Sequence, residues 1–500
     1  MTQEYNESLW VATSPKTDYP QICEDLEADV VVVGGGITGL TTALLLQREG
    51  IRTALLEANR VAMGTSGFTT GKLTALQSLT YATLEKQFGS EGARVYAEAN
   101  MAAIEQVARL VEAYGIECDF ERRSAYTYTT EKGQLAQFRA EVAAAGRAGL
   151  PAEFIQETEL PFAVAGGVRL DEQAQFHARS YCLGLSEALI GAGGAIYEQS
   201  RVVDVEERGE EYLLRTAHGS TFRARQVVIA TLLPILDRGG FFAKTSPARS
   251  YLLAYRTPGG APFRGMYIAK SQPTRTLRSF GEWTIIGGEN HKVGQEPDTP
   301  GRYAAIAAWA REHFGLEEPA FQWSSQDYMP LDHVPYVGRM PRSRDELMVA
   351  TGFGKCGLTN GTVAAMILRD KMLNRENPWP RLYSSTRLDA RNSARRFVQG
   401  NLDVARHFVS YRVQNPSRTR ASRLAPGDGG IVKLDGVKVA AFRDQDGNLH
   451  TFSPNCPHMG CPLTWNNAEK SWDCPCHGSR FGAMGHYLQG PAVKDMKPKK

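Results

Sequence analysis

The fold of this 500-residue chain is decided by the stretch Ala28-Asp29-Val30-Val31-Val32-Val33-Gly34-Gly35-Gly36-Ile37-Thr38-Gly39. The valine run predicts a buried strand, the G-x-G-x-x-G pattern predicts a tight turn, and the apolar stretch from Leu40 to Leu46 predicts a helix. Glu57 follows about twenty residues later, at the end of a second predicted strand from Arg52 to Leu56. This order indicates an α/β domain that binds a dinucleotide, with the pyrophosphate at the helix N-terminus and a ribose hydroxyl at Glu57.

A second motif lies near the C-terminus, where Cys456-Pro457-His458 is followed by Cys474-Pro475-Cys476-His477. A C-x-H paired with a C-x-x-H is the ligand set of a Rieske [2Fe-2S] cluster, in which two thiolates hold one iron and two imidazoles hold the other. A structural zinc knuckle and chance cysteines in a loop-rich tail are the alternatives. The motif therefore predicts an electron carrier whose metal ligands are Cys456, His458, Cys474 and His477.

The region around these ligands resembles the high-potential Rieske proteins. The resemblance implies a disulfide between Cys461 and Cys476, a hydrogen bond from Ser479 to a bridging sulfide, and a third cluster loop at Gly490-Pro491-Ala492. Phe481 stands where the high-potential members carry a tyrosine that bonds a ligand sulfur. Because losing a donor to sulfur lowers the potential, we expect a mid-range Rieske potential.

Composition and length are typical of a globular enzyme with two or three domains. The sequence is 42% hydrophobic and 22% charged, and its net charge of +3 gives no indication of a nucleic-acid partner. We find no signal-like segment near the N-terminus and no run of eighteen apolar residues, which predicts a cytoplasmic protein without a transmembrane segment.

The first motif does not distinguish FAD from NAD, so later segments decide between them. Val349-Ala350-Thr351-Gly352-Phe353-Gly354-Lys355-Cys356-Gly357-Leu358-Thr359 predicts a strand that ends in a glycine-rich turn and opens a helix. With this motif, residues from about 25 to 380 resemble the D-amino-acid oxidase superfamily, the glycine and sarcosine oxidase relatives. The resemblance implies FAD, with the turn along its isoalloxazine ring, whereas an ordinary strand-turn-helix is the alternative.

The expected FAD contacts come from both motifs and from the small donors between them. They are Gly34, Gly36, Ile37, Thr38, Gly39, Glu57, Ala58, Thr65, Ser66, Thr70, Gly71, Val202, Ala230, Thr231, Gly352, Gly354, Lys355, Cys356, Gly357, Leu358 and Thr359. No second G-x-G-x-x-G follows, so we expect the substrate itself, rather than a nicotinamide, to reduce the flavin.

The predicted fold class is α/β, with a Rossmann-type FAD-binding domain, an interleaved antiparallel-sheet substrate domain, and a small all-β Rieske domain. We expect an N-terminal extension at 1–25, the oxidoreductase at 26–380, an arginine-rich linker at 381–425 and the Rieske domain at 426–500. Within the oxidoreductase, the FAD-binding parts are expected at about 26–90, 150–235 and 325–380, and the substrate parts at about 91–149 and 236–324.

The substrate is predicted from the stretch Trp323 to Asp332, which resembles the W-x-G-x-R-P segment of amino-acid oxidases. In that family the arginine grips a substrate carboxylate, but the matching position here holds Asp327. This charge reversal predicts a cationic amine, and a solvated or helix-capping aspartate is the alternative. His177 and Lys355 are the other predicted catalytic residues, although a histidine in the position of His177 is more often structural.

The linker carries ten arginines between Arg381 and Arg423, against the two acids Asp389 and Asp403. An apolar stripe from about Leu388 to Val413 predicts a helix that docks on the flavin domain, followed by a hinge from Gln414 to Gly430. Peripheral contact of this helix with a membrane is the alternative.

These features predict a two-centre dehydrogenase. A small-molecule amine would reduce FAD, and electrons would pass through the Rieske cluster to an unknown acceptor, such as a quinone, a cytochrome or another redox protein. The alternatives are an oxidase that uses dioxygen, with the cluster as a redox switch or structural element; an electron-transfer or redox-sensing protein; and a Rieske oxygenase, although we find no clear 2-His-1-carboxylate set.

Overall fold

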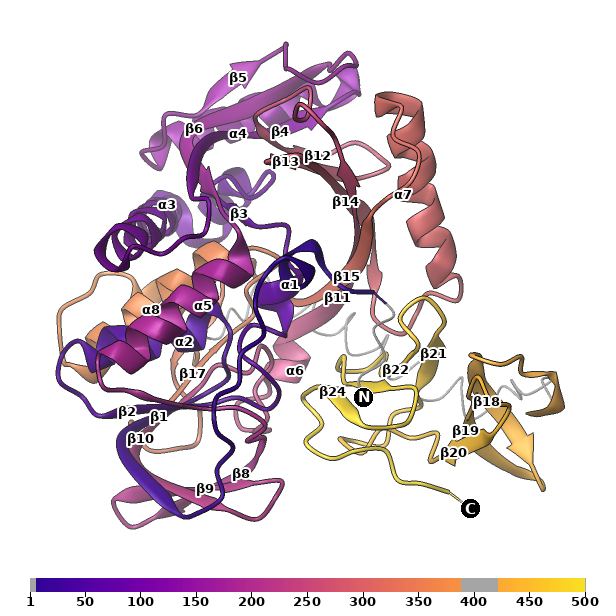
Figure 1. The fold of residues 1–500 in the computed structure, drawn as a ribbon. Coiled ribbons are helices and arrows are strands. Elements are labelled where there is room, and N and C mark those ends of the chain that lie inside the picture. The colour runs from indigo at the N-terminus through magenta and orange to yellow at the C-terminus, as the bar shows by residue number, and fades with distance from the viewer. Residues whose placement is uncertain (1–5, 388–420, 500) are drawn as a thin grey trace.

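The computed structural model describes residues 6–387 and 421–499. It arranges them as two large sheets, helices that pack on both sheets, and a small β domain at the C-terminus (Figure 1). The predicted linker helix from Leu388 to Val413 lies outside the described residues, as does most of the predicted hinge.

The first sheet confirms the predicted Rossmann arrangement. Its central strands run parallel in the order β17-β10-β1-β2-β7, and β16 joins the edge next to β17 in the antiparallel direction. The strands of the first sheet are β1 (Leu26–Val33), β2 (Thr53–Leu56), β7 (Ala195–Tyr197), β8 (Val202–Arg208), β9 (Glu211–Thr216), β10 (Thr221–Ile229), β16 (Tyr336–Arg339) and β17 (Leu347–Thr351). Helices α2 (Ile37–Gln47), α5 (Ala178–Gly191) and α8 (Gly357–Met372) pack together in one apolar core with this sheet.

The turn from β1 into α2 requires glycine at two positions. Gly34 has a φ of +115°, and a Cβ there would lie 2.5 Å from the carbonyl oxygen of Ala230. A Cβ on Gly39 would lie 1.9 Å from the carbonyl oxygen of Gly34, so only glycine lets the helix approach the strand this closely.

The second sheet has nine strands and is mostly antiparallel, in the order β15-β11-β14-β13-β12-β4-β6-β3, with β5 beside β6. Its strands are β3 (Lys72–Leu73), β4 (Glu121–Thr129), β5 (Glu153–Ile155), β6 (Gly166–Gln175), β11 (Thr245–Arg256), β12 (Met266–Ala269), β13 (Arg275–Phe280), β14 (Trp283–Lys292) and β15 (Phe321–Pro330). We expected residues 150–235 to belong to the FAD-binding part, but β5 and β6 pair in this second sheet instead. The pairing of β6 with β4 is long-range and leaves no local signal in the sequence.

Three helices pack around the second sheet. Helix α3 (Tyr81–Tyr114) is interrupted at Gly89, which has a φ of 74°. Helix α4 (Leu135–Arg147) follows a short 3-10 turn, η2 (Lys132–Gln134). Helix α7 (Thr299–Phe314) covers the outer face of β11 and β14.

The N-terminal extension packs inside the oxidoreductase region. Helix α1 (Leu9–Ala12) places the fully buried Trp10 against the 3-10 turn η1 (Thr65–Phe68), and the Trp10 indole donates to the carbonyl oxygen of Thr69. The Arg278 guanidinium lies 4.9 Å from the centre of the Trp10 ring. This segment therefore joins both sheets near the predicted flavin contacts.

The C-terminal domain contains the predicted antiparallel strands, arranged as two small sheets. They are β18 (Gly429–Leu434), β19 (Val437–Arg443) and β20 (Leu449–Phe452) in one sheet, and β21 (Thr464–Asn466), β22 (Ser471–Asp473), β23 (Arg480–Gly482) and β24 (Tyr487–Gln489) in the other. The elements not yet listed are α6 (Phe241–Lys244), α9 (Pro380–Tyr383) and η3 (Ala421–Arg423).

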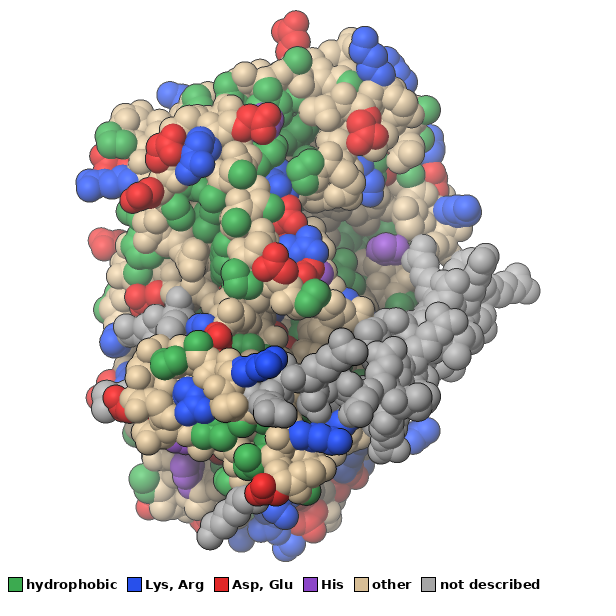
Figure 2. Space-filling model, turned by 90° about the vertical axis from the view of Figure 1, so that its right-hand side faces the viewer, with side chains coloured by type: hydrophobic (Ala, Val, Ile, Leu, Met, Phe, Trp, Pro, Cys, Tyr) green, Lys and Arg blue, Asp and Glu red, His purple; other side chains and the backbone are tan. Residues whose placement is uncertain are grey.

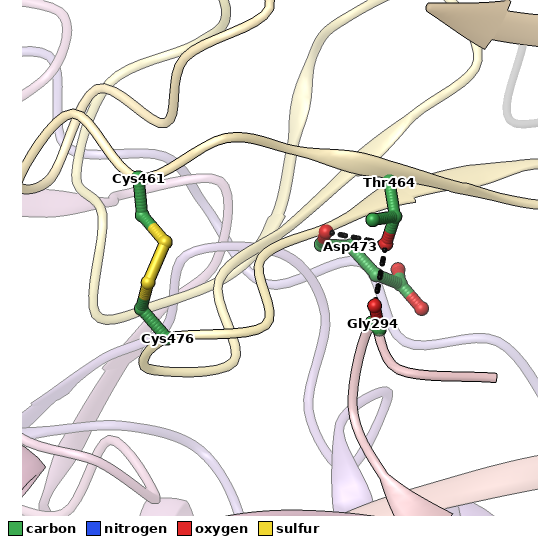
Figure 3. The surroundings of a disulfide bond; sticks show 5 residues. All are labelled: Gly294, Cys461, Thr464, Asp473 and Cys476. Carbon is green, nitrogen blue, oxygen red and sulfur yellow. Dashed lines mark hydrogen bonds between the residues drawn. A yellow bond between two sulfur atoms is a disulfide. The ribbon is translucent and has the colours of Figure 1, made fainter. Parts of the chain in front are cut away.

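This domain packs closely against the second sheet, below β11, β14 and α7 (Figure 1). Gly294 has a φ of +69°, and a Cβ there would lie 2.8 Å from the backbone nitrogen of Pro475. The Thr464 hydroxyl lies 3.1 Å from the carbonyl oxygens of both Gly294 and Asp473 (Figure 3). The interface is therefore close enough to require glycine at position 294.

In the described part of the chain, no helix is both long and apolar enough to cross a membrane.

Candidate functional site

The four predicted metal ligands come together at one end of the C-terminal domain. Cys456 and His458 lie in the loop between β20 and β21, and Cys474 and His477 lie in the turn between β22 and β23. The predicted disulfide between Cys461 and Cys476 is confirmed, and it joins these two loops (Figure 3).

The donor atoms of the four ligands fit a [2Fe-2S] cluster. The Cys456 and Cys474 thiols are buried and hydrogen-bonded to each other, which lowers the pKa of Cys456 to about 7. The Nδ1 atoms of His458 and His477 are also buried and have no hydrogen-bond partner among the described residues. Two adjacent thiols and two unpartnered imidazole nitrogens are the donors that a Rieske cluster needs.

A second group of sulfur atoms does not form a separate metal site. The Cys474 sulfur lies within 4.8 Å of the sulfurs of Cys461 and Cys476. Because those two cysteines are bonded to each other, they are not thiolates and cannot act as ordinary ligands.

The residues that the Rieske resemblance singled out surround the ligands. The Ser479 hydroxyl is hydrogen-bonded to Cys456 and accepts the backbone N–H of Ala492, which lies in the predicted third loop. Phe481 is fully buried in the domain core. Phe481 has no hydroxyl that could donate to a ligand sulfur. The mid-range potential expected for this reason stays a prediction.

The histidine edge of the site faces the oxidoreductase part of the chain. The His458 Nε2 lies 2.9 Å and 3.1 Å from the two carboxylate oxygens of Asp237, and the His458 side chain is only 7% exposed. The Phe242 ring packs on the His477 ring at 4.8 Å. The histidine edges are therefore covered by Asp237, in the loop after β10, and by Phe242, in α6.

The predicted FAD cradle is formed by the turn after β1 and the residues around it. The Glu57 carboxylate accepts the backbone N–H groups of Gly35 at 2.6 Å and Asn59 at 2.8 Å, and burial raises its pKa. The Ser66 hydroxyl accepts the N–H of Ile37 at the start of α2. A Cβ on Gly36 would lie 3.1 Å from that hydroxyl, so the turn has little room for a side chain.

The other predicted contacts lie around this cradle or at the start of α8. Ala230 and Thr231 end β10 beside Gly34, Ala58 follows Glu57, and Val202 begins β8 two residues after Ser200, which bonds the Glu57 carbonyl. Thr38 and Gly39 are buried in the first turn of α2. Thr65 and Ser66 lie in η1, and Thr70 and Gly71 lie just before β3, where the Thr70 carbonyl accepts a bond from Arg278.

The glycine-rich turn before α8 has an unusual backbone. Gly352, Gly354 and Lys355 have φ values of 76°, 64° and 68°. Cys356 is the N-cap of α8, Gly357 and Leu358 form its first turn, and the Thr359 hydroxyl bonds the backbone of Thr74 beside β3. The start of α8 thus lies beside the second sheet, as the flavin interpretation requires.

Strand β15 connects this turn to the cluster loops. Along its outer edge, the Gln326 carbonyl accepts the Thr65 hydroxyl at 2.9 Å, and the Tyr328 carbonyl accepts the Gly354 N–H at 3.1 Å. The Gln326 amide donates to the Gly478 carbonyl at 2.7 Å. The Tyr328 hydroxyl lies 3.0 Å from the carbonyl oxygen of His477.

Asp327 lies between these two connections and binds the backbone. Its carboxylate accepts the N–H groups of Tyr328 at 2.7 Å and Lys355 at 2.6 Å. Burial raises the pKa of Asp327 to about 6 and lowers that of Lys355 to about 8. Because both carboxylate oxygens already hold backbone amides, a cationic substrate is not needed to explain this aspartate, and substrate binding by Asp327 stays a prediction.

His177 has a structural environment. It is the N-cap of α5, where its Nδ1 accepts the Ser180 N–H at 3.1 Å, and its Nε2 lies 3.0 Å from the Thr13 hydroxyl. Burial lowers the pKa of His177 to about 4, so the ring is neutral at pH 7. With both nitrogens occupied, the ring has no free position for a substrate proton, which supports the structural alternative.

The sequence analysis missed Lys72, the first residue of β3. Its ammonium group donates to the carbonyl oxygen of Tyr267 at 3.2 Å and to the Thr276 hydroxyl, and burial lowers its pKa to about 7. Its charge also interacts with those of Arg278 and Cys356, and Cys356 is the N-cap of α8. A lysine in the apolar pattern that follows Gly71 was the only signal available.

Comparison with known proteins agrees with both halves of the site. Residues 29–371 match the family model for FAD dependent oxidoreductase, and residues 418–498 match the model for the Rieske [2Fe-2S] domain. The chain belongs to the FAD dependent oxidoreductase family. It is an FAD-dependent oxidoreductase with a C-terminal Rieske domain, and its cofactors are FAD and a [2Fe-2S] cluster.

Some similar proteins align with the whole chain, and others align with only a part of it. YhfW of Bacillus subtilis (strain 168), named as a Rieske 2Fe-2S iron-sulfur protein, is 34% identical over 99% of this chain and 98% of its own length. The gamma-glutamylputrescine oxidoreductase of Escherichia coli (strain K12) is 28% identical over 45% of this chain and 54% of its own. Glycine oxidase from Geobacillus kaustophilus shares the fold, with a TM-score of 0.63 and 20% identity over 73% of this chain and 99% of its own.

The substitution Asp327→Asn tests whether the Asp327 carboxylate serves to bind backbone N–H groups or to bind the substrate. An amide side chain offers only one oxygen, so one of the two backbone N–H groups loses its acceptor. We expect a loss of about 1–3 kcal/mol in the free energy of unfolding. We expect equal changes in KM for cationic and uncharged amines. A rise in KM confined to cationic amines, with unchanged thermal unfolding, would instead establish Asp327 as the substrate anchor.

Proposed function

We propose that this protein oxidises the C–N bond of a small-molecule amine or amino acid and passes the electrons, within one chain, to the Rieske domain and then to an external one-electron acceptor. The substrate carbon loses a hydride and the nitrogen loses a proton, so the C–N single bond becomes C=N. Water then hydrolyses the imine to a carbonyl compound and ammonia or a smaller amine. When bound, FAD supplies the hydride acceptor and the cluster supplies a one-electron carrier.

The observation that carries this proposal is the link through β15. Asp327 holds the Lys355 amide of the predicted flavin turn, and the next residue, Tyr328, reaches the carbonyl oxygen of the cluster ligand His477. The two sites are therefore joined by two hydrogen bonds and by the covalent link between the neighbouring residues Asp327 and Tyr328. A cluster that served only as a structural element would not need its histidine edge placed at the flavin side of the chain.

The covered histidine edge also bears on the oxidase alternative. Asp237, which contacts His458, lies in the loop that follows the predicted FAD contacts Ala230 and Thr231, and Phe242, which contacts His477, lies in α6 just after this loop. A dioxygen-dependent oxidase would work without this arrangement. The proposed dehydrogenase needs the cluster close to the flavin side of the chain, and we favour the dehydrogenase for that reason.

Anaerobic mixing tests the proposal directly. The protein loaded with FAD and cluster is mixed with a panel of amines and amino acids, while flavin absorbance and the electron paramagnetic resonance signal of the reduced cluster are followed together. We expect one class of substrate to bleach the flavin and to produce the cluster signal in the same sample. Bleached flavin with a silent cluster, followed by peroxide formation in air, would support the oxidase instead.

Proton removal from the substrate nitrogen also needs a group on this chain. Hydride loss requires a neutral amine, and His177 is already fully hydrogen-bonded. Lys72 has a pKa of about 7, so a large fraction of it is neutral and able to accept a proton at neutral pH. We assign this role to Lys72 because its strand, β3, lies beside the start of α8, where Thr74 and Thr359 are hydrogen-bonded.

The pH dependence of kcat/KM tests the assignment. A base with a pKa of about 7 is protonated and inactive below that pH, so kcat/KM should rise as pH increases to about 7 and then level off. Lys72→Met should remove this limb and lower the rate at pH 8 by roughly 100-fold or more. Lys355→Met, which removes the predicted catalytic lysine, should keep the limb. Loss of the limb in the Lys355 variant alone would overturn the assignment to Lys72.

A further inference from the structure

The docked histidine edge leaves open how electrons leave the cluster. The interface that covers it includes the fully buried Arg249, which lies 4.0 Å from the Asp473 carboxylate of the Rieske domain, and the Tyr303 hydroxyl, which donates to Glu469 at 2.8 Å. If the Rieske domain undocked, the charges of Arg249 and Asp473 would be separated, which costs free energy. An external partner therefore needs another face of the Rieske domain.

A pocket provides that second face. It opens directly over the ligand Cys456 and is lined by Pro457, Asn455 and Met496, together with residues from 494 to 498 near the C-terminus. All of its lining residues belong to the described part of the Rieske domain, and none comes from the oxidoreductase. The cluster is thus approached from its histidine side by this chain and from its cysteine side by an open surface.

The rim of this pocket has a net positive charge. Lys494 and Lys497 are both exposed on it. The acid on the rim, Asp495, is already paired with Arg201 at 3.0 Å and accepts the Tyr487 N–H. Met459, in the same loop as Cys456, is 53% exposed.

Figure 2 shows Lys and Arg side chains on the lower part of the face, among exposed hydrophobic side chains and some Asp and Glu side chains. An apolar centre with a basic rim is suited to a partner with the opposite charge.

We propose that the pocket over Cys456, with its rim of Lys494 and Lys497, is the docking surface and electron exit for a small electron-carrier protein with an acidic surface. One electron leaves the reduced cluster and reduces one oxidised metal centre of the partner, and no atom is transferred. A Rieske cluster of the expected mid-range potential lies above low-potential ferredoxins, which makes them inefficient acceptors and favours a higher-potential carrier, such as a haem protein. The inference extends the proposed function by identifying its acceptor class, and it rests on that function only for the source of the electrons.

Two forms of cytochrome c serve as the probe. Native cytochrome c has a basic surface, and the succinylated protein has an acidic one with the same haem. The cluster of the full-length protein is reduced chemically, so that no amine substrate is required, and haem reduction is followed by stopped flow at several salt concentrations. Binding of the oxidised succinylated form is measured separately from the rates. We expect faster reduction and tighter binding for the succinylated form, with both effects falling as salt increases.

A matched pair of variants tests the location. Lys494→Glu with Lys497→Glu should reduce the rate and the affinity for the succinylated probe on the order of tenfold or more. Lys86→Glu with Lys132→Glu makes the same charge change at exposed positions of the oxidoreductase, in α3 and η2, and should leave both values unchanged. The cluster signal itself should be the same in all forms.

The proposed exit surface would be overturned if both double variants lost rate and affinity equally, or if the Lys494→Glu, Lys497→Glu variant lost neither. Preference of the unmodified protein for native cytochrome c would do the same. If instead no amine reduces the cluster but the probe results are as expected, the proposed function fails and the exit surface stands.

Discussion

The arrangement of the two redox sites depends on the outer edge of strand β15. An edge strand exposes backbone groups that must find partners, and here the partners come from both sites. The carbonyl groups of Gln326 and Tyr328 bind η1 and the turn before α8, while their side chains bind the cluster loops. Each site therefore contributes to holding the other in place.

Burial makes this arrangement fixed rather than adjustable. Arg249 donates to Ser324 and Gln326 and faces Asp473, and Asp473 in turn binds Arg480 at 3.0 Å. Such a network is weak evidence for stability, but removing one member leaves a buried charge unpaired. Together with the close contact of Gly294 on Pro475, it favours the docking position seen here.

The sequence was informative wherever chemistry is local. The glycine turn after β1 and the four cluster ligands could be predicted because their spacing along the chain is itself the requirement, and the disulfide could be predicted from the resemblance to Rieske proteins. The position of β6 in the second sheet and the covered histidine edge could not, because both depend on residues distant in sequence. Asp237 and His458 are 221 positions apart, and nothing near either one indicates the other.

The same distinction applies to the candidate catalytic residues. His177 and Asp327 were selected by position relative to a family pattern, yet the structure gives both of them backbone groups to bind. Lys72 belongs to no sequence motif. It becomes a candidate base only because burial lowers its pKa to about 7. Residue type and spacing thus locate a site, whereas the burial of each group determines what it can do there.

Electron transfer within one docked chain is the central requirement of the proposed mechanism, and one flash experiment measures it. The flavin is reduced by a light pulse, and the rate of cluster reduction is compared in Gly294→Ala and Gly281→Ala, two glycines with positive φ of which only the first contacts the Rieske domain. We predict a first-order rate that is independent of protein concentration in the wild type and in Gly281→Ala, and a slower rate in Gly294→Ala. A wild-type rate that increases in proportion to protein concentration would contradict the account.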